Sequence, residues 1–155
     1  MGKHITRFAI VAALGSLTAC GGSSPTAPTN ANVAGSYDLT ITASSTCSAS
    51  LPSETRVLTY LATVTQTGAA VQVTLQGHVI FNSVTISGTV SGQTLNFSTF
   101  SVNEITESDG VVLATTGTAS VAANGSINGT LSGTYQTTSG TNCNTGSHQI
   151  QMVKR

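Results

Sequence analysis

Apolar and polar residues alternate along nearly all of the chain after its N-terminal region. Tyr37 and Leu39 are separated by a polar residue, and the same spacing recurs in later runs as far as Met152. A period of two puts the apolar side chains on one face of a β-strand and the polar side chains on the other. About eight such runs can be traced, a number at which a closed antiparallel barrel is just wide enough to be filled by side chains or to hold one small ligand. The sequence therefore predicts an all-β fold, a single small up-and-down barrel over residues 35–155, with a β-sandwich of similar strands as the alternative.

The lengths of the connections between these runs favour an up-and-down order. The short connections follow the second, fourth and sixth runs, at Thr67-Gly68-Ala69, Ser91-Gly92-Gln93 and Asn124-Gly125. The longer connections follow the first, third, fifth and seventh runs, at residues 44–55, 76–83, 103–110 and 137–147. Asn-Gly is the preferred pair in a two-residue type I′ hairpin. Because alternate connections of a meander lie at opposite ends, we expect all tight turns at one end of the barrel and all long loops at the other.

The N-terminal region has the features of an export signal. Lys3, His4 and Arg7 make the start of the chain cationic, residues 8–17 form an apolar core, and Ala19 is small. The apolar run is too short to cross a bilayer core of about 30 Å as a helix. Its last residues, Leu17-Thr18-Ala19-Cys20, resemble the lipobox of bacterial lipoproteins. The resemblance implies that residues 1–19 are removed as a signal peptide and that the Cys20 thiol is lipidated, with palmitate as a typical acyl chain.

Residues 20–34 are predicted to be the lipidated cysteine followed by a flexible tether. The stretch consists mainly of Gly, Ser, Thr, Pro, Ala and Asn, which cannot bury enough apolar surface to order it. Gly21 stands where an Asp favours retention in the inner membrane of some bacteria. We therefore expect a protein of the bacterial cell envelope, lipid-anchored in the outer membrane and facing the periplasm or the cell surface.

The number of cysteines agrees with lipidation of one of them. The chain contains three cysteines, and lipidation of Cys20 leaves Cys47 and Cys143 as a pair in an oxidising compartment. Cys47 follows the first run and Cys143 precedes the last, and closure of a barrel makes these two strands neighbours. We predict a disulfide between them at the long-loop end, with a stabilisation of about 4 kcal/mol from chain entropy.

Charged residues are scarce. Only 6% of the residues are Asp, Glu, Lys or Arg, against about 25% in typical globular domains. There is no basic patch of the kind that binds nucleic acid. Aliphatic and β-branched residues recur throughout, which excludes the highly charged composition of disordered chains. We expect a monomer that contacts the membrane through its lipid and does not bind nucleic acid.

Gly35-Ser36-Tyr37 opens the first run, at the position where lipocalins and avidins usually have Gly-x-Trp. Together with the meander, this makes the domain similar to the small eight-stranded barrels of those families. The resemblance covers the architecture of the domain and implies a cavity for a small ligand. It specifies no ligand, because no Trp is present and none of the ligand residues of these families can be placed here.

Four residues are the candidates for binding a ligand inside the barrel. Tyr37, Tyr60 and Tyr135 share the apolar side of their runs, and His148 alternates in phase with Ile150. Aromatic rings offer apolar contact, and their hydroxyls offer a hydrogen bond. Filling of the core is the alternative role for the tyrosines.

Four glycines lie on the same apolar side as these candidates: Gly88, Gly117, Gly129 and Gly133. They either leave room for a ligand or allow strands to bend and approach each other closely. The sequence leaves both explanations open.

Two functions follow from these observations, and neither is enzymatic. The chain has no CxxC pair, no metal-ligand spacing, and no nucleophile in a recognisable turn that would make His78 or His148 catalytic. We therefore expect neither a cofactor nor a metal. The first hypothesis is a binding module for a small apolar ligand, in the cavity or at the long-loop end. The second is a structural or interaction lipoprotein whose uncharged Thr- and Ser-rich faces contact another envelope component or a glycan.

Overall fold

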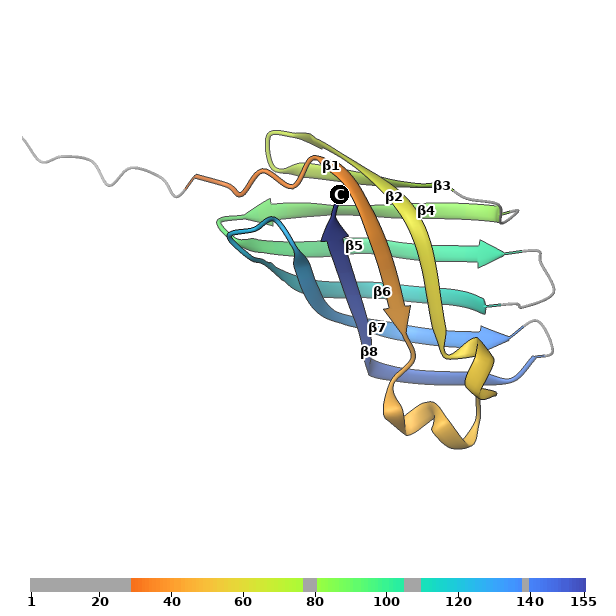
Figure 1. Ribbon diagram of the computed structural model, residues 1–155. Helices are drawn as coiled ribbons and strands as arrows, with labels where there is room; N and C mark the ends of the chain where they lie inside the picture. Colours follow the sequence, from red (N-terminus) through yellow and green to blue (C-terminus); the bar gives the residue numbers. More distant parts are fainter. Residues whose placement is uncertain (1–28, 77–80, 105–109, 138–139) are drawn as a thin grey trace, which may run out of the picture.

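The computed structural model describes residues 29–76, 81–104, 110–137 and 140–155, which form a closed antiparallel barrel (Figure 1). Each strand pairs with the next in the chain, and the last strand closes on the first. The elements are β1 (Gly35–Thr42), η1 (Ser45–Ala49), η2 (Ser53–Thr55), β2 (Val57–Thr67), β3 (Ala70–Gln76), β4 (Phe81–Ser91), β5 (Thr94–Glu104), β6 (Gly110–Val121), β7 (Ile127–Thr137) and β8 (Asn142–Lys154). The predicted up-and-down barrel is confirmed, and the sandwich alternative is excluded.

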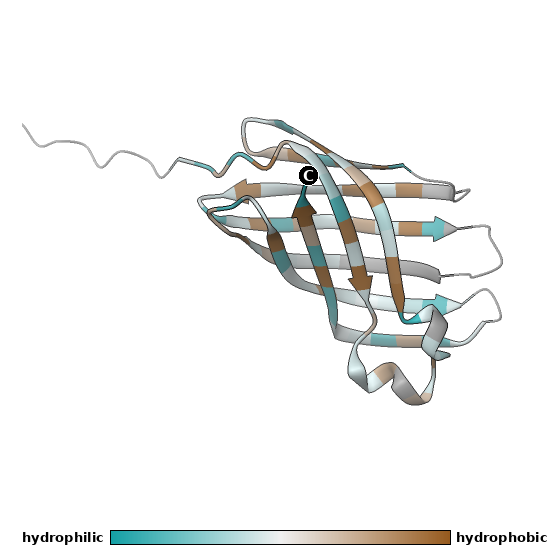
Figure 2. Cartoon of the chain, in the orientation of Figure 1, coloured by the Kyte–Doolittle hydropathy of each residue, from teal (hydrophilic) through white to brown (hydrophobic). Residues whose placement is uncertain are grey.

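The apolar residues of the alternating pattern point into the barrel, and the polar residues between them point outward. In β3, buried Val71, Val73 and Leu75 alternate with exposed residues. Figure 2 shows the same banding of hydrophobic and hydrophilic residues along the curved strands β1, β2 and β8. The inward residues form one core cluster, and burial of each large aliphatic side chain stabilises the fold by about 1.5–3 kcal/mol. The core therefore fixes the register of the strands, since a slip by one residue would turn the apolar face outward.

A β-bulge interrupts the alternation in β5. Ser87 pairs with Thr99 and Gly88 pairs with Phe97, which leaves Ser98 without a partner in the ladder. The extra residue shifts the inward side, so that both Phe97 and Phe100 are buried. Their rings meet edge to face at 5.4 Å. Simple alternation misses the inward position of Phe100, because a bulge changes the phase of a strand.

The connections alternate between the two ends of the barrel as expected, but their lengths do not separate: five residues lie between β6 and β7, whereas four lie between β7 and β8. The turns β2–β3, β4–β5 and β6–β7 lie together at one end, called the tight-turn end below, and the other connections lie at the long-loop end (Figure 1). The prediction of a two-residue hairpin at Asn124-Gly125 is wrong, because residues 122–126 all belong to the turn. Asn124 Oδ1 accepts hydrogen bonds from the N–H and the hydroxyl of Ser126, and Gly125 takes a left-handed φ of 81°.

The segment that precedes β1 packs against the tight-turn end. Ala31 donates its N–H to the Gly92 carbonyl, and Gly92 donates its N–H to Asn30 Oδ1. The Gln66 side chain accepts from the N–H of Val33 and donates to the carbonyl of Ala31. Val33 is fully buried. We call residues 30–34 the N-terminal strap.

The strap corrects the expected domain boundary. Residues 20–34 were expected to be flexible, yet the strap is held by side-chain and backbone hydrogen bonds. Its composition is polar, but its polar groups find partners and Val33 enters the core. The signal peptide 1–19, Cys20 and the rest of the expected tether up to residue 28 lie outside the described residues.

The long-loop end carries the connection between β1 and β2, which contains the short helices η1 and η2 (Figure 1). Arg56 donates from Nε to the Leu51 carbonyl over 2.8 Å, and Leu51 and Cys47 are buried. Ala43 donates its N–H to the Arg56 carbonyl. These contacts fold the loop back onto the core. No helix in the described part of the chain is long and apolar enough to cross a membrane.

Candidate functional site

The seam between β1 and β8, which closes the barrel, is a hydrogen-bonded ladder over part of its length and is bridged by side chains over the rest. Residues Tyr37–Thr42 of β1 pair with Gln149–Lys154 of β8 in a regular ladder. Before Gln149, the described part of β8 pairs with β7 alone. There the gap between β8 and the loop after β1 is bridged by side chains: Ser44 Oγ lies 2.9 Å from Ser147 Oγ.

The predicted disulfide is confirmed at this point. Cys47 and Cys143 are bonded, with their Cα atoms 5.6 Å apart, and the bond joins residues separated by 96 positions. Cys47 belongs to η1 and Cys143 to β8. The bond therefore ties the β1–β2 loop to the part of β8 that β1 does not reach.

His148 is the second link across the same gap. Its side chain is fully buried, and its Nδ1 accepts the N–H of Ser44 at 3.2 Å. Because Nδ1 is an acceptor, the proton of the neutral ring is on Nε2, which donates to the Gly133 carbonyl at 3.1 Å. Burial lowers the pKa of His148, although the bond to Gly133 acts in the opposite direction. Both ring nitrogens are thus committed to the backbone of the protein.

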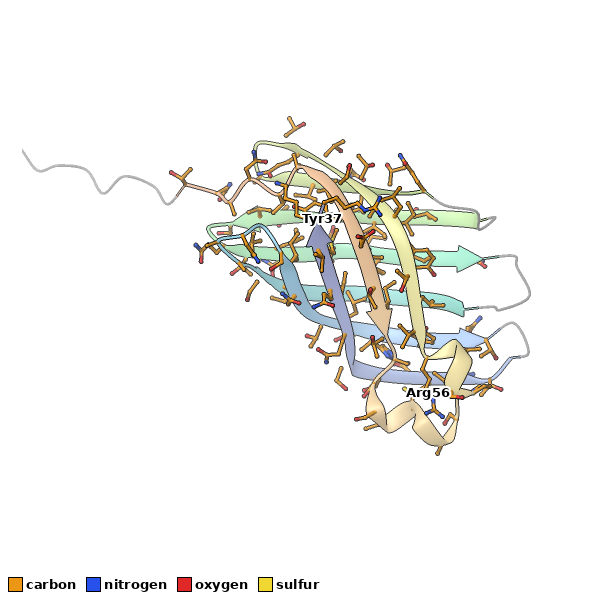
Figure 3. All side chains as sticks on the ribbon, in the orientation of Figure 1. Tyr37 and Arg56 are labelled. Carbon is orange, nitrogen blue, oxygen red and sulfur yellow. A yellow bond between two sulfur atoms is a disulfide. The ribbon has the colours of Figure 1, made fainter. Side chains whose placement is uncertain are left out.

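Near the tight-turn end, Tyr37 is likewise hydrogen-bonded to the backbone of the protein. Its side chain is buried, and its hydroxyl donates to the carbonyl of Val33 in the strap at 2.8 Å. Burial raises the pKa of this hydroxyl. Figure 3 shows Tyr37 near the start of β1, far from Arg56 at the long-loop end.

The remaining candidates are also inside the barrel. Tyr60 is 5% exposed and Tyr135 is fully buried. The Tyr135 ring lies 5.6 Å from the His148 ring. The structure therefore brings Tyr135 and His148 together and places Tyr37 apart from them, so the four candidates do not form one site.

The inward glycines serve close packing between strands. A Cβ atom on Gly129 would collide with the Thr118 carbonyl, and one on Gly117 would lie 2.5 Å from Leu131 Cδ2. A Cβ atom on Gly88 would collide with the backbone of β5. The space beside these three glycines is taken by neighbouring strands and side chains, which favours close approach over room for a ligand at these positions.

Two hollows lie side by side on the outer surface, over the seam. The first, of about 240 Å³, is lined by Thr40, Thr42, Asn128, Gly129, Gln149, Ile150 and Gln151. The second, of about 470 Å³, is lined by Thr42, Ala43, Ser44, Ser45, Ser147 and Gln149. Because Thr42 and Gln149 border both, we treat the two as one feature and call it the seam groove.

The side chains of the seam groove are uncharged, and only some of them are engaged: Ser44 and Ser147 bond to each other, and Gln149 Nε2 donates to the Ser147 carbonyl. Thr40, Thr42, Asn128 and Gln151 make no side-chain hydrogen bond within the part of the chain that the structure describes. Elsewhere on the outer surface, some side chains of this kind bond to each other across strands, whereas others, such as Gln72 and Thr74 on β3, make no side-chain hydrogen bond to a described residue either. The bonded pairs are Gln76 with Thr63, Ser87 with Ser98, and Thr118 with Asn96.

Sequence reasoning missed this groove. Alternation correctly places Thr40 and Gln151 on the outer face, and the register makes them direct neighbours across the seam. The first hollow lies over strands that are still paired, the second lies beside the gap past Thr42, and the sequence carries no local signal for either.

Among the residues that the structure describes, no three His, Cys, Asp or Glu side chains gather as a metal site would require. His78 lies outside those residues. The closed barrel is consistent with a lipocalin- or avidin-like architecture. Comparison of the chain with protein-family models, curated proteins and solved structures finds no significant match.

Proposed function

We propose that the protein is a lipid-anchored, non-enzymatic interaction module of the bacterial envelope that contacts another envelope component or a glycan through the outer face of its barrel. One contrast carries this proposal. The inward polar groups of Tyr37 and His148 are bonded to the protein's own backbone, whereas the groove side chains of Thr40 and Gln151 make no hydrogen bond to any residue that the structure describes.

The orientation on the membrane follows from where the strap lies. The strap binds at the tight-turn end, so a lipid on Cys20 would hold this end toward the bilayer. The η1 side of the seam groove would then face away from the outer membrane. This arrangement leaves the groove open to a partner in the periplasm or at the cell surface.

Binding of a small apolar ligand stays a prediction, and the geometry supports it less. Tyr37 and the Tyr135–His148 pair lie in different parts of the barrel, and the space beside Gly88, Gly117 and Gly129 is taken by neighbouring strands and side chains. Native mass spectrometry of protein purified from the envelope tests this alternative. A bound apolar adduct of constant mass would support it over our proposal.

Crosslinking in cells tests the proposed function. A photoreactive residue at Thr40, in the groove, is compared with one at Gln72, an exposed outward position on β3. We expect capture of an envelope component from the position of Thr40 and much less from that of Gln72. Equal capture at both positions, or no capture at either, contradicts a specific interaction through the seam groove.

Fractionation of the same cells tests the anchor. The Cys20→Ser variant is expected to lose its lipid and leave the membrane fraction, while the unmodified protein stays in it. If the variant remains in the membrane fraction, the anchor is not the lipid on Cys20.

A further inference from the structure

We infer that the seam groove is a binding site for a single strand of uncharged carbohydrate. The inference rests on the proposed function and names the chemical class of the partner.

The lining of the groove favours a neutral ligand. None of the residues that line the two hollows is charged. The nearest charged group along β1, Asp38, is paired with Arg155 at 3.0 Å and is two residues from Thr40. A ligand with a charge would lose water on entering the groove and would find no counter-charge there. A polyhydroxylated, uncharged molecule carries no such penalty.

The hydrogen-bonding groups match those of sugar hydroxyls. Thr40 faces Gln151 across the seam, Gln151 faces Asn128 on β7, and Thr42 faces Gln149. Hydroxyl and amide side chains both donate and accept, as sugar hydroxyls do. Neighbouring strands are about 4.8 Å apart, and successive outward residues on one strand are about 7 Å apart. The groove floor is thus a small grid of groups that can bond several hydroxyls at once.

The backbone at the same place argues against a peptide. An extended peptide commonly binds by adding a strand to an open sheet edge. Under the first hollow, β8 is paired with β1 on one side and with β7 on the other. No edge is therefore offered between Thr40 and Gln151, so recognition in the first hollow must come from side chains; beside Ser147, at the second hollow, the described part of β8 is no longer paired with β1.

The shape of the groove favours a chain over a single sugar. The first hollow continues past the end of β1 into the larger one, beside Ser45 and Ser147. The larger hollow, about 470 Å³, lies within the range of about 300–1,000 Å³ that is usual for small-molecule sites, and the smaller, about 240 Å³, lies below it. An occupant that fills both must be long and must follow the seam.

The expected affinity of one site is low. No aromatic ring lines the groove, so a sugar gains little apolar contact there. We expect a dissociation constant of about a millimolar for one site. Many lipid-anchored copies facing one polymer would bind it together far more tightly, since the later contacts are intramolecular.

Nuclear magnetic resonance of the full chain in detergent micelles tests the inference. The probes are maltohexaose, cellohexaose and chitohexaose, which are uncharged, and oligogalacturonate of similar length, which is acidic. At least one uncharged probe should shift the side-chain amide signals of Gln149 and Gln151 in a saturable manner. Oligogalacturonate should not shift them.

Two matched variants locate the site. Gln151→Ala should weaken binding by about tenfold, the effect of losing one or two hydrogen bonds. Gln72→Ala removes the same side chain from an exposed position on β3 and should leave binding unchanged. Equal midpoints of thermal unfolding for both variants and the unmodified protein show that folding is not the cause.

Each contrary result has a separate meaning. If no uncharged probe shifts Gln149 or Gln151, or if Gln72→Ala weakens binding as much as Gln151→Ala, the carbohydrate site is overturned. If the crosslinker at Thr40 captures a protein in cells, the proposed interaction function stands and the carbohydrate inference fails. If binding is seen with purified protein but the crosslinker captures nothing, the interaction function fails instead.

Discussion

The two ends of the barrel are closed by different means. At the tight-turn end, the strap is held by backbone and amide hydrogen bonds around Gln66 and Gly92. At the long-loop end, a disulfide and a buried histidine hold the β1–β2 loop against β8. The first kind of closure depends on neither redox state nor pH near neutrality, whereas the second depends on both.

The difference has a geometric origin. At the tight-turn end the turns hold adjacent strands together, so the strap only has to cover the open end of the barrel. At the other end β8 extends beyond its pairing with β1, and the described residues before Gln149 have no ladder on that side. Side-chain links do not require two paired strands. The disulfide and the hydrogen bond from the Ser44 N–H to the His148 ring can therefore bridge this gap.

Loss of the disulfide should have the largest effect. Replacement of Cys47 and Cys143 by Ala removes a link across 96 positions, and we expect unfolding to become easier by about 4 kcal/mol. Urea unfolding of the variant and of the unmodified protein measures the difference. Reduction of the unmodified protein should give a similar loss. A loss below about 1 kcal/mol would mean that non-covalent contacts alone hold the long-loop end.

His148→Ala should have the next largest effect. It leaves the Ser44 N–H and the Gly133 carbonyl without their partners and opens a cavity beside Tyr135. We expect a loss of about 3 kcal/mol, from unpaired backbone groups and lost packing. Urea unfolding at pH 7 measures it. An effect no larger than that of replacing an exposed residue would show that the ring is not a link across the gap.

The stability of the long-loop end should also depend on pH. Burial lowers the pKa of His148 in the folded state from its ordinary value of 6.5, which the unfolded chain retains. Below about pH 6.5 the unfolded chain therefore binds more protons, so stability is full above that pH and falls as the pH drops toward the folded-state pKa. Protonation would also place a hydrogen on Nδ1, opposite the Ser44 N–H.

Unfolding measured between pH 7.5 and pH 5 tests this dependence, with His148→Ala as the control. The part of the pH dependence that belongs to His148 should be absent from the variant. Curves of the same slope for both proteins would assign the acid sensitivity to other groups.

The sequence predicted the long-loop end better than the tight-turn end. Alternation and the positions of Cys47 and Cys143 were sufficient for the barrel, its closing seam and the disulfide, whereas the lengths of the connections did not separate between the two ends as expected. The alternation repeats along the strands, and cysteine is a rare residue type with a specific bonding partner, so both signals can be recognised in the sequence. The phase change at Ser98 was not predictable, because a bulge inserts a residue without changing the composition of the strand.

The strap and the seam groove could not be predicted for a related reason. The strap is held by one backbone pair, Ala31 with Gly92, and by the side chains of Asn30 and Gln66, whose residue types alone do not show that they bond to backbone groups. Thr40 and Gln151 were expected on the outer face, but threonine and glutamine occupy many outward positions. Only the three-dimensional pairing distinguishes side chains that bond to each other from those that border a hollow.

Gln66→Ala should loosen the tight-turn end by a smaller amount. The variant leaves the Val33 N–H and the Ala31 carbonyl without the bonds that Gln66 supplies. We expect a loss of about 2 kcal/mol, because the freed groups can recover part of their hydrogen bonding from water. Hydrogen exchange should show the Val33 N–H exchanging faster, with exchange near His148 unchanged. Faster exchange at both ends would mean that the two closures are coupled.

Tyr37→Phe should have the smallest effect and should separate the strap from the core. The ring keeps its buried position under Val33, and only the hydroxyl that bonds to the Val33 carbonyl is removed. We expect a loss of about 1 kcal/mol, typical of one hydrogen bond whose acceptor can turn to water. Combined with Gln66→Ala, the loss should differ from the sum of the single losses, because both side chains hold Val33. Combined with His148→Ala, the losses should add, since the two sites share no contact. If the second pair is the one that fails to add, the tight-turn and long-loop ends act as one unit and the contrast between them disappears.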